Sequence, residues 1–296
     1  MDVYDENKHL IHSFAAHADI IEHIKLLSDN NVASCSDDKM IKIWNTNTWS
    51  LIKTLSGHTS NVFQIDQIDS DTLVSASMDM TYRVWSISTG TQIASHTFTN
   101  QVYAVKIISS GLLAVGLQVA SSNLQLYNWT MGTLITSLGG HTDTVFNIEI
   151  LDSQNIASAS ADFNVIIWNL AGGTAPGQSA LAFTLSGHTD NVIDLKLLSS
   201  TLLASGSNDN TIKLWNWNVG SLVRTLTGHT SWIWKSLDIF SGNVLISGSG
   251  DMSIKFWNIT NGSLIESIPS NISINTLSML SSGKFIYFIF KVKNLR

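Results

Sequence analysis

The chain has 296 residues, of which 44% are hydrophobic and 13% charged, a composition that supports a large buried core and excludes a disordered chain. The net charge is −6 and the three arginines are scattered, so no basic face is present for the phosphates of nucleic acid. No apolar run reaches the roughly 18–20 residues of a membrane span.

The single cysteine, Cys35, excludes an internal disulfide and favours a reducing compartment. The acidic, polar N-terminus, Met1–Glu6, is unlike a secretory signal. We therefore expect an intracellular, cytoplasmic protein, with a nuclear location left open.

Strand-like runs follow one another along the chain, and helical periodicity is absent. The first run, His9–Phe14, resembles Ser50–Leu55 and Ser221–Leu226. From residue 15 onward, units of about 40–45 residues each hold four short runs rich in Val, Ile, Leu, Tyr and Trp. In the second unit these runs are Val62–Ile68, Thr72–Ala76, Tyr82–Trp85 and Gln92–Phe98.

The units share three positions in a fixed register. A histidine opens the unit, an aromatic residue closes the third run, and an aspartate lies six residues before that aromatic residue. Successive closing aromatic residues are 41, 42, 41, 47 and 42 residues apart. They are Trp44, Trp85, Tyr127, Trp168, Trp215 and Trp257. The histidines are His17, His58, His141, His188 and His229, and the aspartates are Asp38, Asp79, Asp162, Asp209 and Asp251.

This pattern resembles the WD40 repeat family over essentially the whole chain, with Trp-Asn in most units where the family usually has Trp-Asp. The resemblance implies an all-β fold, a seven-bladed β-propeller that is one domain over 1–296. The repeats expected are 15–55, 56–98, 99–138, 139–185, 186–226 and 227–268. The last blade is expected to combine a single N-terminal outer strand, 9–14, with an incomplete repeat, 269–296.

Three stretches depart from the pattern. The third unit has Ser121 in place of aspartate and Tyr127 in place of tryptophan, so we expect a weaker hydrogen-bond set there. The segment Ala171–Ala180 is expected to be a loop insertion. In the last unit Asn294-Leu295-Arg296 aligns with Ser253-Ile254-Lys255, so the chain is expected to be truncated before its closing aromatic residue.

Five units each carry a serine, a histidine, an aspartate and a tryptophan. Such residues can form a nucleophilic triad, but five near-identical copies argue against catalysis, because an enzyme needs one active site. The resemblance implies instead a buried hydrogen-bond network that fixes the strand turns. The sets are His17, Ser34, Asp38, Trp44; His58, Ser75, Asp79, Trp85; His141, Ser158, Asp162, Trp168; His188, Ser205, Asp209, Trp215; and His229, Ser247, Asp251, Trp257.

The resemblance also implies a partner surface on the face where the first strands begin, here called the top face. Residues that follow the Gly-His and precede the turn aspartate would line the mouth of a central channel there, although each could instead pack between blades. Tryptophan and tyrosine are frequent anchors of binding surfaces. The expected partner-binding residues are Ile20, Glu22, Phe63, Met78, Tyr103, Phe146, Trp232 and Trp234.

Charge narrows the expected partner. Asp19, Asp37, Asp143 and Asp190 lie in the same loops, where Lys235 is the one nearby cation. A basic or apolar protein or peptide therefore fits better than a phosphorylated partner, nucleic acid or membrane. The histidine spacing matches no zinc site and no phosphate-binding glycine loop occurs, so we expect no metal and no cofactor.

Three functional hypotheses follow. The first is a non-enzymatic WD40 scaffold that binds protein or peptide partners. The second is a substrate-recruiting or regulatory module of a larger protein, such as a ubiquitin-ligase adaptor or a kinase-linked repeat array. The third is an enzyme that uses the central channel, which would require one asymmetric cluster of catalytic groups; the sequence contains no such cluster.

Overall fold

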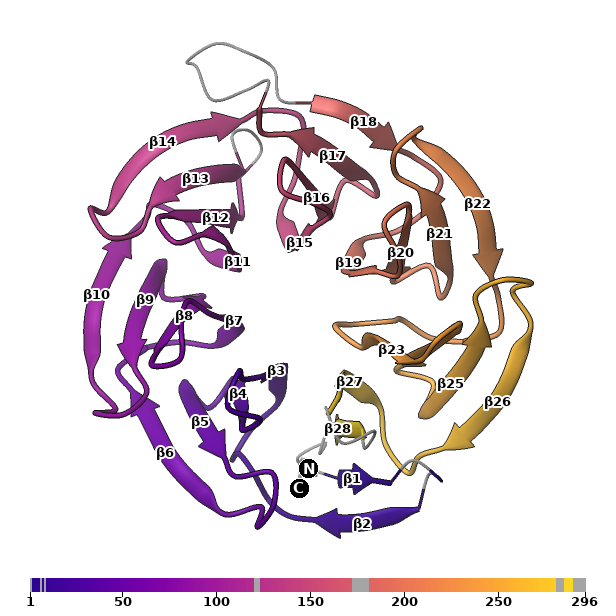
Figure 1. The fold of residues 1–296 in the computed structure, drawn as a ribbon, viewed down its shortest axis with the longest axis horizontal. Helices are drawn as coiled ribbons and strands as arrows, with labels where there is room; N and C mark the ends of the chain where they lie inside the picture. The colour runs from indigo at the N-terminus through magenta and orange to yellow at the C-terminus, as the bar shows by residue number, and fades with distance from the viewer. Residues whose placement is uncertain are drawn as a thin grey trace, which may run out of the picture.

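The structure is a computed structural model that describes residues 2–5, 7, 9–119, 123–171, 181–280 and 285–289. Seven four-stranded antiparallel sheets stand in a ring (Figure 1), and their first strands line a cavity at its centre, here called the channel. This arrangement confirms the all-β, seven-bladed β-propeller predicted from the repeats. No helix in this part of the chain is long and apolar enough to cross a membrane.

Each blade is one sheet, and in six of them the strands follow chain order from the channel outward. The first two blades consist of β3 (Ile21–Leu26), β4 (Val32–Ser36), β5 (Met40–Trp44) and β6 (Leu51–Ser56), and of β7 (Val62–Gln67), β8 (Thr72–Ser77), β9 (Thr81–Ser86) and β10 (Gln92–Thr97). The third and fourth consist of β11 (Val102–Ser109), β12 (Leu112–Leu117), β13 (Leu124–Asn128) and β14 (Thr133–Leu138), and of β15 (Val145–Ile150), β16 (Asn155–Ser160), β17 (Val165–Asn169) and β18 (Leu181–Leu185).

The fifth and sixth blades consist of β19 (Val192–Leu197), β20 (Leu202–Ser207), β21 (Ile212–Asn216) and β22 (Ser221–Leu226), and of β23 (Leu237–Ser241), β24 (Val244–Gly248), β25 (Ser253–Asn258) and β26 (Leu264–Pro269). The seventh, called the closing blade, has the order β27 (Ile274–Met279), β28 (Phe285–Ile289), β1 (Asp2–Tyr4), β2 (Leu10–Ser13) from the channel outward.

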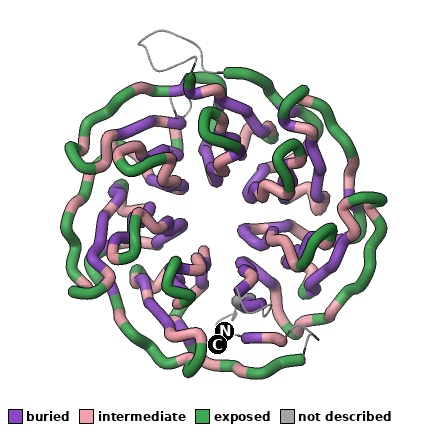
Figure 2. Tube along the Cα trace, in the orientation of Figure 1, coloured by how far each residue is buried: buried purple, intermediate pink, exposed green. Residues whose placement is uncertain are grey.

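Burial follows the position of a strand within its blade. The second and third strands lie between two neighbouring blades, so both of their faces are covered and β8 is buried at every residue (Figure 2). Small residues such as Ser75 and Ala76 allow the sheets to approach there. The outermost strands have one face toward solvent and are largely exposed, as in β10 and β26.

Each junction between neighbouring blades holds one apolar cluster, and the closing aromatic residue of a blade packs toward the blade before it. Trp85 of the second blade, for example, packs with Leu55 and Val62 at the junction with the first. The glycine of the Gly-His pair leaves room for this ring, because a Cβ on Gly140 would come within 2.9 Å of the Trp168 ring. The repeated tryptophan is therefore a junction residue.

The closing blade differs from the prediction. We expected one strand from the N-terminal end and the remaining strands from the C-terminal end, but each end contributes two. β1 takes the third place in the sheet and pairs with β28 (Figure 1). The segment that aligns with a third strand, Asn294–Arg296, lies outside the described residues, as do Ser121 and most of Ala171–Ala180.

The register of β1 identifies a seventh closing aromatic residue. Tyr4 pairs with Phe285, just as Trp85 pairs with Leu73 in the second blade. Its ring stacks on Phe285 at 5.3 Å, in the cluster between the sixth and closing blades. Tyr4 therefore supplies the aromatic residue that we expected to be missing after Arg296.

Val3 tests this closure. Its side chain is fully buried in the cluster between the closing blade and the first blade. Val3→Asp places an unpaired carboxylate there, and we expect it to lower the free energy of unfolding by about 3–5 kcal/mol. Urea denaturation measures this change, with the exposed neighbour His9→Ala as control; equal midpoints for both variants and the natural chain would show that β1 does not close the ring.

Candidate functional site

The five predicted Ser-His-Asp-Trp sets are each brought together by hydrogen bonds. In the fifth blade Trp215 Nε1 lies 2.8 Å from Ser205 Oγ, His188 Nε2 lies 2.7 Å from the same oxygen, and His188 Nδ1 lies 2.7 Å from Asp209 Oδ2. The other four sets repeat these bonds at 2.7–3.0 Å.

The donors and acceptors fit one direction. The tryptophan N–H donates to the serine oxygen, so the serine O–H donates to the histidine Nε2, and the histidine Nδ1–H donates to the aspartate. Burial lowers the pKa of His17, His58 and His229 against the opposing effect of the aspartate, which keeps these rings neutral. We call this chain of bonds the blade relay.

Each relay ends on a turn. The aspartate also accepts the backbone N–H of the residue after the histidine, as Asp209 does from Thr189, and of the residue two positions after itself, as it does from Thr211. It therefore joins the loop between blades to the turn between the second and third strands. The relay serines are fully buried, which favours a structural role for the relay over a catalytic one.

The third blade holds a different set. Tyr127 donates to Gln125 at 3.0 Å and packs against Phe98 and His96. Buried Asn123 donates to the backbone oxygens of Asp143 and Val119. The bond to Asp143 links this blade to the loop of the fourth blade without a histidine.

A β-bulge lies at the top of the first strand in six blades. Two residues of the first strand there face one residue of the second strand, and such a bulge re-aims a side chain. The six bulge residues are Glu22, Phe63, Tyr103, Phe146, Ile193 and Asn275. In the sixth blade the corresponding stretch is one residue longer and contains Trp234 and Lys235.

Five of the predicted partner-binding residues form a continuous arc of rings, here called the aromatic arc. Phe63 stacks on Tyr103 at 4.3 Å, and Tyr103 meets Phe146 at 5.4 Å. Phe146 meets Trp234 at 6.4 Å, and Trp234 meets Trp232 at 6.2 Å. The arc therefore runs from the second blade to the sixth.

The arc is anchored on acidic and basic groups. Trp234 Nε1 donates to Glu22 of the first blade at 3.0 Å. Lys235 reaches from the sixth blade to the carbonyl oxygen of Phe63 in the second, at 2.9 Å. Burial lowers the pKa of Lys235, opposed by the negative charges of Glu22 and other acids. These two bonds cross the channel and narrow its upper end.

The predicted partner-binding residues therefore differ in exposure. Phe63 and Glu22 are only 8% and 7% exposed, because they contribute to the arc and its anchor. Tyr103, Phe146, Trp232 and Trp234 are half-buried and present ring edges at the mouth, as are Ile20 and Met78 in the loops beside it. On the opposite face, Trp217 is buried. Trp49 is half-buried against His12 of the closing blade, and Trp129 is half-buried and donates to the backbone oxygen of Ser110 in its own blade.

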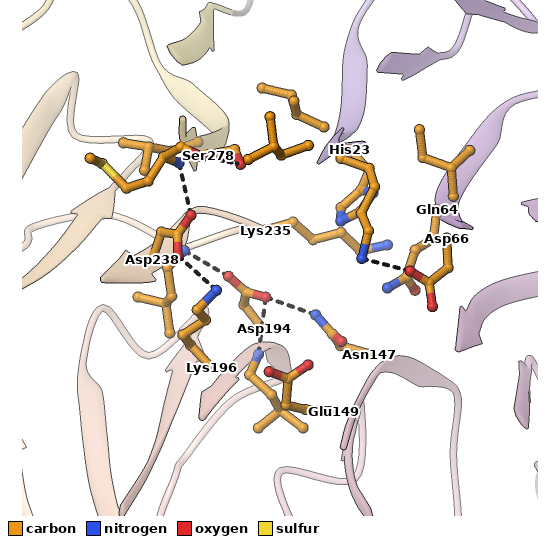
Figure 3. A pocket seen from close by; sticks show the side chains of 18 of the residues that line it. His23, Gln64, Asp66, Asn147, Glu149, Asp194, Lys196, Lys235, Asp238 and Ser278 are labelled. Carbon is orange, nitrogen blue, oxygen red and sulfur yellow. Dashed lines mark hydrogen bonds and ion pairs between the residues drawn. The ribbon is translucent and has the colours of Figure 1, made fainter. Parts of the chain in front are cut away.

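Below the arc lies a cavity of about 440 Å³ that the sequence did not predict (Figure 3). At equivalent positions of the first strand, six of the seven blades place a charged residue in its wall, with alternating sign. Ion pairs of 2.7 Å join Lys25 to Asp66, Lys106 to Glu149 and Lys196 to Asp238. The seventh position is neutral, at Ser278. We call this set the alternating ring.

Each acid of the alternating ring also bonds to the next blade. Asp66 accepts the backbone N–H of Ile107, Glu149 that of Leu197, and Asp238 that of Met279, at 3.0, 3.4 and 2.8 Å. Burial alone would raise the pKa of Asp66. The charges of Lys25 and Lys106 oppose this effect, and the pKa is lowered overall. The ring therefore links the first blade to the seventh in sequence, one junction after another.

Comparison with known proteins agrees with this geometry. The family model described as "WD domain, G-beta repeat" matches residues 8–45, 49–86, 132–169, 179–216 and 220–258, more than half of the chain. The chain belongs to the WD40 repeat family. The unmatched stretch 87–131 contains the first three strands of the third blade, which lacks the blade relay.

Two similar proteins illustrate the match. The nuclear distribution protein PAC1-2 of Uncinocarpus reesii (strain UAMH 1704) is 32% identical over 175 residues, which is 54% of this chain and 38% of that protein. The crystal structure of the WD40 β-propeller domain of Doa1 matches with a TM-score of 0.79 at 20% identity, covering 93% of this chain and 92% of that one. The second likeness shows the fold alone.

The alternating ring could have been found in the sequence of this WD40 chain. The residues Lys25, Asp66, Lys106, Glu149 and Lys196 recur at one position of the repeat. Lys235 could not be found in this way, because the stretch before β23 in the sixth blade is one residue longer and Lys235 does not align with a repeat position of the other blades.

His188 tests the blade relay. His188→Ala leaves Ser205 and Asp209 without their shared partner, and an unpaired buried group typically costs about 1–3 kcal/mol. We expect the free energy of unfolding, measured by urea denaturation, to fall by about that amount. The exposed neighbour Thr189→Ala is the control, and an unchanged midpoint for His188→Ala would contradict the structural assignment.

Asp37, beside Glu22, gives a pH-dependent prediction. Burial and the negative charges of Glu22 and Asp19 raise the pKa of Asp37 to about 7, above the value of about 3.9 in an unfolded chain. Folding therefore takes up a proton, and the contribution of Asp37 to stability is full below pH about 4 and is lost as pH rises through about 7.

The neutral variant Asp37→Asn has no carboxyl group at this position, so its stability does not fall in this way as pH rises. We expect its free energy of unfolding, relative to the natural chain, to increase between pH about 4 and about 7 and then to level off. Urea denaturation at several pH values checks this, with exposed Asp29→Asn as control; a difference independent of pH would be incompatible with the raised pKa.

Proposed function

We propose that this WD40 protein is a non-enzymatic interaction scaffold that binds protein or peptide partners through its top face. The observation that carries the proposal is the aromatic arc, which brings rings from four blades together at the channel mouth. Half-buried tryptophan and tyrosine rings are preorganised anchors, since little side-chain freedom remains to be lost on binding.

The bonds beneath the arc define how a partner would sit. Trp234 and Lys235 extend across the upper channel to Glu22 and to the backbone of Phe63. A partner would therefore lie over the mouth, in contact with the ring edges of Tyr103 and Phe146, and would not insert a long side chain along the axis.

Charge supports a basic or apolar partner. Asp19 and Asp143 are exposed and Asp190 is half-buried on the top face. No ion pair joins these three carboxylates to a lysine or arginine within the described ranges. Unpaired surface acids attract basic segments and disfavour phosphate groups or nucleic acid.

A second candidate is a recruiting or regulatory module of a larger protein, such as a ubiquitin-ligase adaptor or a kinase-linked repeat array. It is favoured by one observation, that the match to the PAC1-2 protein spans 38% of the length of that relative. Both candidates use the same surface and differ in what else is attached. An intracellular, cytoplasmic or nuclear location is part of the proposal, supported by the lone, buried Cys35.

The test is affinity capture from cell extract with quantitative mass spectrometry. The bait variant Phe146→Ala with Trp232→Ala removes two half-buried rings of the arc, and Val219→Ala removes an exposed apolar side chain from a loop between third and fourth strands. We expect a partner that the natural chain and Val219→Ala retain and that the arc variant loses.

The folding of each bait is checked by cooperative thermal unfolding before capture. A partner that all three baits retain would place the binding surface away from the arc. Capture of no partner by any bait would count against a scaffold.

A further inference from the structure

The turn between the second and third strands of the blades contains an unusual residue. The position directly after the relay aspartate has a left-handed backbone in all five blades with a relay, at φ of 73°, 65°, 71°, 68° and 61°. These residues are Lys39, Met80, Phe163, Asn210 and Met252. Outside glycine, this conformation is tolerated best by asparagine and aspartate, so Asn210 is the residue that backbone preference favours.

Three of the five positions carry large apolar side chains that are open to solvent. Met80, Phe163 and Met252 are 43%, 42% and 49% exposed. None of them belongs to an apolar cluster of the described residues. These side chains therefore have neither the backbone preference for this conformation nor a place in the core, and we call them the apolar turn residues.

Trp49 is a bulky residue with a left-handed backbone whose presence has a structural reason. It lies at φ 58°, five residues after Trp44, where Gly90, Gly220 and Gly262 stand in other blades. Its ring packs against His12 and Phe14 on or beside the outer strand of the closing blade. The bulky residue is thus accounted for by ring closure, whereas Phe163 makes no ring contact within the described residues.

We propose that the apolar turn residues are contact points for a partner segment that carries both apolar and basic side chains. They stand on the second, fourth and sixth blades, in turns that adjoin the arc. In the sixth blade the backbone N–H of Gly250, two residues before Met252, donates to the carbonyl oxygen of Trp232. The proposal rests on the proposed function and extends its surface outward from the channel mouth.

The basic part of the partner follows from the charges between these contact points. Asp143 lies in the loop of the fourth blade, where its carbonyl oxygen accepts the hydroxyl of Ser160, three residues before Phe163. Asp190 lies in the equivalent loop of the fifth blade. Lys39 takes the turn position on the first blade, so a basic segment would meet a like charge at that turn.

Stability gives the first half of the test. The triple variant Met80→Asn, Phe163→Asn, Met252→Asn places asparagine at all three turns, as in the fifth blade, where the position is Asn210. Because asparagine tolerates the left-handed backbone, we expect its melting temperature to equal or exceed that of the natural chain. A lower melting temperature would show that these side chains stabilise the fold and would overturn the proposal.

Binding gives the second half. A display library of random 16-residue peptides is selected on the natural chain, and enriched peptides are synthesised and titrated by fluorescence anisotropy. We expect peptides rich in apolar residues with Lys or Arg, which bind the triple variant about tenfold more weakly or worse. The variant Met131→Asn, which removes a methionine exposed by 75% elsewhere, should bind them as the natural chain does.

The remaining outcomes separate this inference from the proposed function. Peptides that lose affinity for the Phe146→Ala, Trp232→Ala variant but not for the triple variant would overturn the inference and leave the arc as a binding site. Peptides unaffected by either variant, or no enrichment at all, would overturn both. Enriched peptides that are acidic would overturn the proposed partner chemistry.

Discussion

Each blade of this ring can bury its two faces only against its neighbours, so closure of the ring is the constraint on which the rest depends. The chain meets it by pairing β1 with β28, which joins Val3 to Ile286. Such a contact closes almost the whole chain into a loop. Interactions at two junctions must together offset the chain entropy that is lost when this loop closes. Tyr4 and Val3 supply them, one toward the sixth blade and one toward the first.

The interactions that maintain the ring and the residues that face a partner lie on different parts of each blade. The blade relay and the closing aromatic residue recur almost unchanged and lie away from the channel. The bulge residues at the mouth vary from Glu22 to Phe63 to Asn275, although the backbone around them is the same. A repeated framework with variable positions lets each blade present a different side chain without altering how the blades pack.

Much of this was readable from the sequence, because the repeat fixes the register. His188, Ser205, Asp209 and Trp215 fall at constant spacing, and the predicted hydrogen-bonded set is what the structure contains. β1 was missed because three residues are too few for a periodic pattern. The sequence left open whether Phe63 and Glu22 are exposed at the mouth or packed between blades, since a bulge breaks the alternation of faces and the rings of different blades cover one another.

The alternating ring has a consequence for how such a molecule can change in size. Opposite charges can alternate without a fault only around an even number of positions, and seven is odd, so one blade must be neutral, as it is at Ser278. Tandem duplication of any single charged blade would set two like charges side by side in a poorly solvated wall. Duplication of two adjacent charged blades would preserve the order. The alternating charges therefore favour an increase in blade number by two charged blades at a time over an increase by one.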